Sequence, residues 1–168
     1  MNIREALLAE HSSAQTAKIV YYIGEDERRF NELVQAFFDG PYRVTQRASW
    51  PMSNCVEAHP KLVRPHIQRL LNELDRDDTH NAVRRNILRL FQFIEIPERY
   101  KGRIFSRCIE FLDDPSEMVA VRVFAMTVAS TIARTEPDLM REVQLVAGKY
   151  LADATPGFRA RARMVLPK

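Results

Sequence analysis

The sequence has 168 residues, of which 46% are hydrophobic and 28% are charged, and its formal net charge is +3. This composition is typical of a folded globular chain and excludes wholesale disorder. The five glycines form no G-x-x-x-x-G-K loop, so this phosphate-binding motif is excluded as well.

Apolar residues recur at helical spacing along the whole chain, and strand-like alternation is absent. Ile67, Leu70, Leu71 and Leu74 follow the i, i+3, i+4, i+7 rule of an amphipathic helix. In chain order, this spacing predicts a lead-in helix over 2–11, then helices over 13–23, 26–39, 42–57, 60–75, 80–95, 98–113, 117–134 and 137–152, and a terminal helix over 157–166.

The apolar pattern repeats at an interval of roughly 38 residues. At this offset Ile67, Phe105 and Val143 align, and Leu112 falls at the position of Leu74. Because the register holds through two helical blocks per interval, the sequence predicts a structural repeat that consists of a pair of helices. The repeats are expected over about 12–40, 41–78, 79–115 and 116–155, within a single domain that spans 1–168.

Proline and polar residues punctuate these repeats. Pro60, Pro97 and Pro137 stand where the second helix of a repeat begins, the position at which the missing N–H of proline costs least. Ser12 and Thr79 precede helical segments and are predicted to be N-caps, and His80 is predicted to lie in a loop or a cap.

The paired helices resemble HEAT repeats. The resemblance is carried by the interval, by the Asp that follows the second helix, and by Val83-Arg84, Val121-Arg122 and Phe158-Arg159 at the start of the next helix. It implies an all-α fold, a right-handed α-α superhelix of about four helical-hairpin repeats plus terminal helices. It also implies that the second helices line a concave face, where the partners of such arrays commonly bind.

Four arginines on the second helices are the candidate partner-binding residues. Opposite the apolar stripe, helical spacing places Arg69, Arg103, Arg107 and Arg141. Stacking of repeats would put Arg69 beside Arg107 and Arg103 beside Arg141, and such columns suit a phosphate backbone or an acidic peptide. The alternative is that neighbouring carboxylates neutralise the columns as surface ion pairs. These carboxylates are Glu73, Glu110, Asp113, Asp114 and Glu142.

No catalytic or metal-binding motif is recognisable. His11, His59, His66 and His80 occupy unrelated repeat positions, and no serine lies in a G-x-S-x-G turn. Trp50 aligns with apolar residues of later repeats and is predicted to pack between helices. We therefore expect no cofactor and no metal.

Cys55 and Cys108 show no C-x-x-C spacing and are expected to be buried free thiols in a reducing compartment. No apolar stretch approaches the ~20 residues of a membrane span.

The resulting hypothesis is a non-catalytic, cytoplasmic scaffold that binds a protein or an acidic peptide on its concave surface. Nucleic-acid binding through the arginine columns, as in a DNA-repair protein, is the alternative, and an enzyme is the third class.

Overall fold

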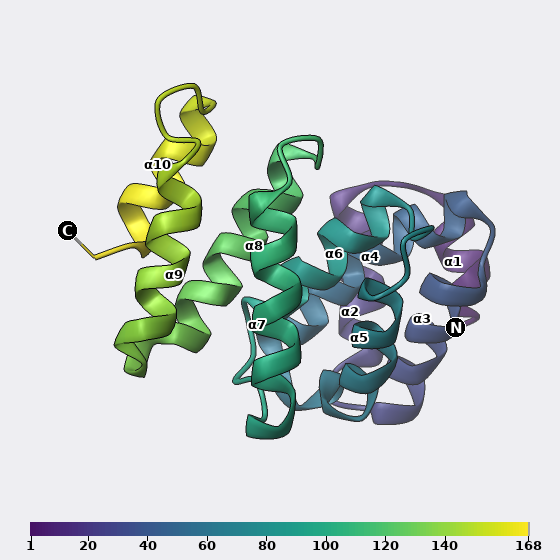
Figure 1. Cartoon of the computed structure of the whole chain (residues 1–168). Coiled ribbons are helices and arrows are strands. Elements are labelled where there is room, and N and C mark those ends of the chain that lie inside the picture. Colours follow the sequence, from purple (N-terminus) through teal and green to yellow (C-terminus); the bar gives the residue numbers. More distant parts are fainter. Residues whose placement is uncertain (168) are drawn as a thin grey trace. The chain divides into compact units, whose positions relative to one another are not determined.

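The computed structural model describes residues 1–167, and among them it contains helices and no strand. Helices account for 77% of the chain, which confirms the all-α prediction (Figure 1). The chain divides into two compact units, Met1–Leu70 and Leu71–Lys168.

The first unit contains α1 (Ile3–Ala9), α2 (Ser13–Ile23), α3 (Glu27–Asp39), α4 (Tyr42–Ala58) and the 3-10 helix η1 (Pro60–His66). Its first three helices begin at side chains that accept hydrogen bonds from free backbone N–H groups, namely Asn2, Ser12 and Asp26. The last turn of α2 is closed by Gly24, whose φ of 51° is accessible to glycine without strain. The core lies between α3 and α4 and is built from Phe30, Leu33, Phe37 and Met52.

The predicted helix over 60–75 is wrong in its first half. Residues Pro60–His66 form the 3-10 helix η1, and α5 begins only at Ile67 and ends at Leu74. The reason is Pro65, which lies at the sixth position of this segment. Proline has no N–H to donate, and its ring clashes with the carbonyl four residues earlier in an α-helix. The tighter 3-10 turn avoids a long run of α-helix through the proline.

The second unit contains α6 (Asn81–Phe91), α7 (Glu98–Asp113), α8 (Val119–Ile132), the 3-10 helix η2 (Ala133–Thr135), α9 (Pro137–Gly148) and α10 (Pro156–Val165). In this unit α8 is the central element, because α6, α7, α9 and α10 all pack against it (Figure 1). Its sequence explains the position, since apolar residues surround the helix on several sides. The buried ones are Val121, Val123, Ala125, Met126, Val128, Ala129 and Ile132.

Several helix ends differ from the predicted ones by a few residues. The predicted helix over 80–95 ends at Phe91, where the N–H groups of Gln92 and Phe93 close the last turn by bonding to the carbonyls of Arg89 and Leu90. The predicted helix over 137–152 ends at Gly148. Thr79 is not an N-cap, because His80 holds that position and its Nδ1 accepts from the N–H of Ala82.

The arginines of the repeated dipeptide share one structural role. Arg84 donates to the carbonyl of Asp77 at 2.7 Å, and Arg122 donates twice to the carbonyl of Leu112 at 3.0 and 3.1 Å. Arg159 reaches the carbonyl of Ala152 at 3.5 Å. Each guanidinium therefore bonds to backbone at or just after the end of the preceding second helix. These bonds tie one helical pair to the next, and the bonds of Arg122 satisfy a carbonyl that the last turn of α7 leaves free.

Candidate partner-binding site

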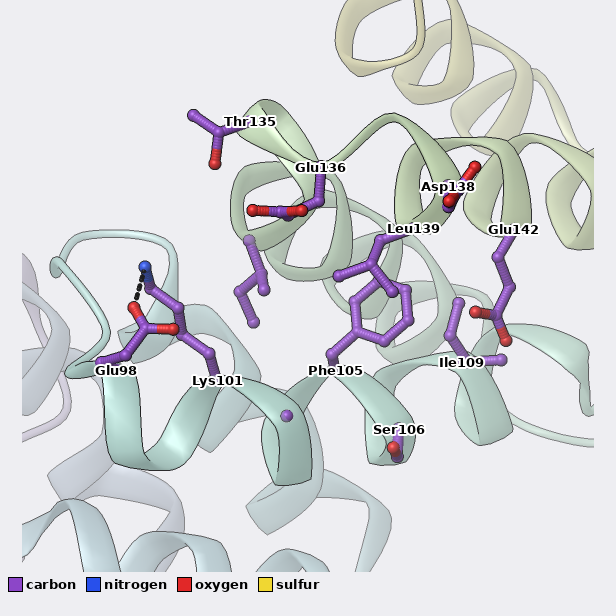
Figure 2. A pocket seen from close by; sticks show the side chains of 12 residues that line it. Glu98, Lys101, Phe105, Ser106, Ile109, Thr135, Glu136, Asp138, Leu139 and Glu142 are labelled. Carbon is purple, nitrogen blue, oxygen red and sulfur yellow. Dashed lines mark ion pairs between the residues drawn. The ribbon is translucent and has the colours of Figure 1, made fainter.

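A cavity of about 820 Å³ lies between α7 and α9, the second helices of two consecutive repeats (Figure 2). Its apolar floor combines Phe105 and Ile109 of α7 with Ile132 of α8 and Leu139 of α9. Figure 2 shows Phe105 and Leu139 pointing toward one another across the cavity. Ile109 and Leu139 are only half-buried, so part of this apolar surface faces solvent.

Glycine widens the cavity on the α7 side. Gly102 lies on the lining, and a Cβ built at this position meets no atom within 4 Å. A glycine inside a helix is less favourable than alanine by about 1 kcal/mol. Here it leaves open space beside Phe105 that a partner side chain could fill.

The rim of the cavity is acidic. Four carboxylates line it against one ammonium group, that of Lys101. Lys101 is bound to Glu98 at 2.6 Å, and this hydrogen bond raises the pKa of the lysine above its ordinary value. The remaining three carboxylates are exposed and have no ion-pair partner within residues 1–167; they belong to Glu136, Asp138 and Glu142. This cavity therefore offers apolar contact together with unpaired negative charge.

In the first unit, Arg69 is held by its own neighbours. Its Nη2 donates to the carboxylate of Asp39 at 2.8 Å, and its guanidinium lies 4.3 Å from the centre of the Phe38 ring. Arg107, its predicted column partner, lies in the second unit.

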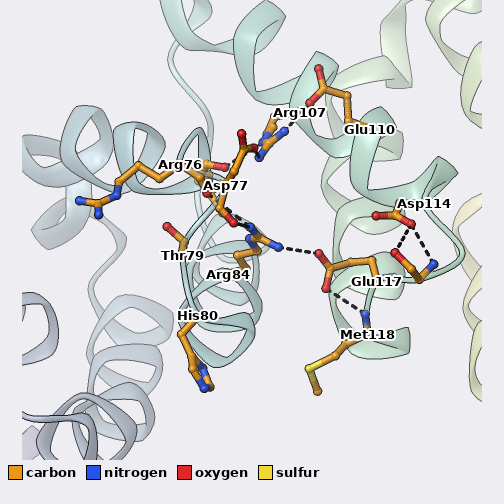
Figure 3. Close-up of polar contacts among 12 residues, drawn as sticks. Arg76, Asp77, Thr79, His80, Arg84, Arg107, Glu110, Asp114, Glu117 and Met118 are labelled. Atoms are coloured by element: carbon orange, nitrogen blue, oxygen red, sulfur yellow. Dashed lines mark hydrogen bonds and ion pairs between the residues drawn. The ribbon is translucent and has the colours of Figure 1, made fainter.

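Arg103 and Arg107 are also engaged by groups of their own unit. Arg103 donates to the carboxylate of Asp75 and to Asn72. Arg107 donates to the carbonyl of Leu74 at 2.8 Å and to Glu110 at 2.5 Å, and Asp77 lies 3.7 Å away (Figure 3). Its guanidinium also stacks 4.5 Å from the centre of the Phe111 ring.

Arg141 has a different environment. It lines a second cavity, formed with α8 and α10, and no ion pair of this arginine occurs within residues 1–167. Arg103 donates to Asp75, whereas Arg141 lines the cavity beside α10. The role of the four arginines in partner binding stays a prediction.

Other candidate chemistry is limited to buried thiols. Burial raises the pKa of the Cys55 thiol to about 12 and raises that of Cys108 further, so neither is a thiolate at neutral pH. Within residues 1–167, no group of three or more His, Cys, Asp or Glu side chains is arranged to hold a metal ion. No helix of the described chain has both the length and the apolar character that crossing a membrane requires.

Trp50 differs from its predicted role. It is partly exposed, and its ring meets that of His11 edge to face at 6.1 Å between centroids. The prediction that Trp50 packs between helices therefore holds only in part, because 39% of its surface is exposed.

A family model described as a HEAT repeat domain matches residues 3–168 of this chain. The chain belongs to the HEAT repeat family. Comparison with curated proteins finds no match. Family membership agrees with the helical pairs and with the repeated arginine bonds to the preceding backbone. It supports a repeat scaffold, a kind of protein that typically mediates protein interactions.

The acidic rim was missed by the sequence analysis, which treated Phe105 only as a core residue. The spacing of residues in this chain could have indicated the cavity. Glu98, Gly102, Phe105 and Ile109 lie at intervals of four, three and four residues, which places them along one face of α7. Asp138, Leu139 and Glu142 form a matching face of α9.

Proposed function

We propose that this HEAT repeat chain is a protein-binding module that holds a segment of its partner between α7 and α9. The observation that carries the proposal is an apolar floor left partly open between two consecutive second helices. An exposed apolar groove with a polar rim is typical of an interaction site.

The charge of the rim favours one kind of occupant. Glu136, Asp138 and Glu142 lie beside the floor without cationic partners among residues 1–167. A segment that carries lysine or arginine together with Leu, Phe or Ile at helical spacing would match both features. The acidic peptide expected from the arginine columns does not fit this cavity, since like charges would face each other.

A random-peptide display library, selected on the whole chain, tests this proposal. We expect the enriched sequences to combine basic residues with large apolar ones. Their synthetic, dye-labelled versions should bind the chain in fluorescence anisotropy, more weakly as salt is raised. Enrichment of acidic sequences, or of none, would contradict the proposal.

Two glycine variants locate the binding site without removing a contact of the fold. Gly102→Trp fills the cavity and should abolish peptide binding. Gly148→Trp is the matched control, because this glycine also lies at an exposed helical position with open space around its Cβ but does not line the cavity. Retained binding in Gly102→Trp would place the peptide elsewhere.

A labelled DNA duplex, measured at low and at physiological salt, examines the nucleic-acid alternative in the same assay. Binding to phosphates would fall steeply with salt. Loss of that binding in an Arg69→Glu, Arg107→Glu double variant would favour nucleic acid over a peptide.

A further inference from the structure

Helix α9 separates two cavities of opposite charge. One side of α9 carries Asp138 and Glu142 toward the acidic cavity. Its other side carries Arg141 and Gln144 into a cavity of about 880 Å³ bordered by α8, η2 and α10. No aspartate or glutamate lines this second cavity in the described part of the chain, whereas Arg141 is joined there by Arg134.

The two arginines of this cavity are exposed and lack the partners that occupy other arginines of the same unit. Neither Arg134 nor Arg141 makes a side-chain hydrogen bond or an ion pair within residues 1–167. Arg84, Arg103 and Arg107, in contrast, each donate to a carboxylate. No carboxylate among residues 1–167 therefore pairs with the positive charge at the second cavity, and a guanidinium suits bidentate binding of a carboxylate or a phosphate.

Hydroxyl groups lie beside these arginines. Ser130, Thr131 and Thr135 line the same cavity. Ser130 is only 4% exposed, and its Oγ has no hydrogen-bond partner within residues 1–167. A buried hydroxyl without a partner is rare and calls for an explanation such as a missing ligand or water. A hydroxyl can donate to the oxygen of an anion just as a guanidinium does.

Apolar side chains line another part of the cavity. Met140 of α9 lines this space together with Met164, Val165 and Leu166 of the C-terminal segment, and Met164 is 74% exposed. Methionine side chains adapt to ligands of varied shape. A small inorganic anion would leave this apolar lining uncovered, so the lining indicates a ligand that is larger than its charged group.

We propose that the cavity between α8, α9 and α10 binds an amphipathic anion, a carboxylate or phosphate group carried on an apolar chain. Arg134 and Arg141 hold the charged group, with hydroxyls of α8 and η2 beside it. Met140 and Met164 cover the apolar chain. The two cavities share Thr135 in their linings, but Arg134, Arg141 and Met140 line the second one and not the first, so either proposal can fail without the other.

Methyl NMR of the full chain, labelled at the methionine methyl groups, tests this site directly. Hexanoate and hexyl phosphate are the probes, and hexanol and inorganic phosphate are the controls. We expect the Met140 and Met164 signals to move saturably with at least one probe, while Met52, buried in the first unit, stays in place. The tighter of the two probes identifies the carboxylate or the phosphate as the charged group.

Charge-removing variants complete the test. Arg134→Gln and Arg141→Gln should each weaken the tighter probe by about tenfold or more, the effect expected for a lost charge-assisted hydrogen bond. Arg89→Gln removes the same charge from α6, outside the cavity, and should leave the affinity within about twofold. Unchanged thermal melts would show that the variants remain folded.

Three results would overturn the proposal. If hexanol moves the two methionine signals at the same concentration as the anions, the charged group has no role. If inorganic phosphate binds as tightly as hexyl phosphate, the apolar chain of the ligand does not contribute to binding. If neither anion moves Met140 or Met164, the cavity is not a site for this class of ligand.

Discussion

Arg84 of α6 and Glu117, in the turn before α8, form an ion pair of 3.0 Å whose side chains are only 13% and 4% exposed (Figure 3). The carboxylate of Glu117 also accepts from the N–H of Met118 at 2.9 Å, and the guanidinium lies 5.6 Å from the centre of the Phe111 ring. The carboxylate of Glu117 thus links the first helices of two consecutive repeats. This ion pair is largely buried, whereas other ion pairs of the chain, such as Arg69–Asp39, are exposed.

Removing both members of this pair should cost less than the sum of the two single removals. Glu117→Ala leaves the largely buried Arg84 charge with the carbonyls of Arg76 and Asp77 as its hydrogen-bond acceptors, and we expect a loss of about 2–4 kcal/mol in the free energy of unfolding. In the double variant Arg84→Met, Glu117→Ala, the loss should be smaller than the sum of the single losses by about 1–3 kcal/mol. Urea unfolding followed by circular dichroism measures the unfolding free energies of Glu117→Ala, Arg84→Met and the double variant, each relative to the wild type.

The pair Arg69–Asp39 is the control for this cycle, because its side chains are 44% and 63% exposed. Its coupling energy should stay below about 1 kcal/mol. Equal coupling energies for the two pairs would show that burial does not decide the strength of the Arg84–Glu117 contact.

The packing of α7 can be examined at a single leucine. Leu112 is fully buried, so Leu112→Ala should cost about 2–5 kcal/mol. Leu112→Asp should unfold the second unit, since it places a carboxylate in the apolar core without a partner. Leu145→Ala is the control at a position 66% exposed, where we expect a change within about 0.5 kcal/mol. A melt of Leu112→Asp that matches the wild type would disprove the repeat register.

Helix positions were predictable from the sequence because they depend on local signals. The segment over 98–113 was predicted with the bounds that α7 has, since Pro97 precedes the helix and an acidic turn follows it. The 3-10 turn at Pro60–His66 was missed because the apolar spacing of Ile67, Leu70 and Leu71 continued to suggest one long helix. A proline six residues into a helix outweighs that spacing.

The candidate sites were less predictable, because long side chains bond to partners that are distant from them in the sequence. Arg103 and its carboxylate partner Asp75 are 28 positions apart, and helical spacing alone does not reveal the contact. Charges near a helix face could be listed from the sequence. Which of them remain unpaired, as at Arg134, Arg141 and Glu142, depends on the packing of neighbouring repeats.

The two thiols should be protected until the chain unfolds. Cys55 and Cys108 are fully buried, and burial raises the pKa of each. We expect native-state alkylation by iodoacetamide to be slower than that of the urea-unfolded chain by about a hundredfold or more, because reaction requires an opened thiolate. Mass spectrometry of the two cysteine peptides measures each rate. Tyr21→Cys, at a side chain 90% exposed, supplies a freely reactive thiol for comparison, and a native Cys108 that reacts as fast would contradict the prediction.

Acid should weaken the second unit through Asp113. Lys149 donates to its carboxylate at 2.9 and 3.0 Å, and the Tyr150 hydroxyl bonds to it at 2.9 Å. The lysine first, and then the tyrosine, hold the pKa of Asp113 below its ordinary value. A carboxyl whose pKa is lower in the folded state stabilises that state above its unfolded pKa, and this contribution is lost as the pH falls through the folded pKa. It is therefore present at about pH 6 and fades below about pH 4.

Urea unfolding between pH 7 and pH 3 measures this contribution. Asp113→Asn should lower the unfolding free energy at neutral pH and flatten its decline with acid, so that variant and wild type converge at low pH. Part of the decline should remain, because hydrogen bonds also hold the pKa values of Asp78 and Asp114 below their ordinary range. Asp153→Asn removes an exposed carboxylate and should keep the slope of the wild type. If Asp113→Asn keeps that slope as well, the bonds from Lys149 and Tyr150 do not contribute to stability.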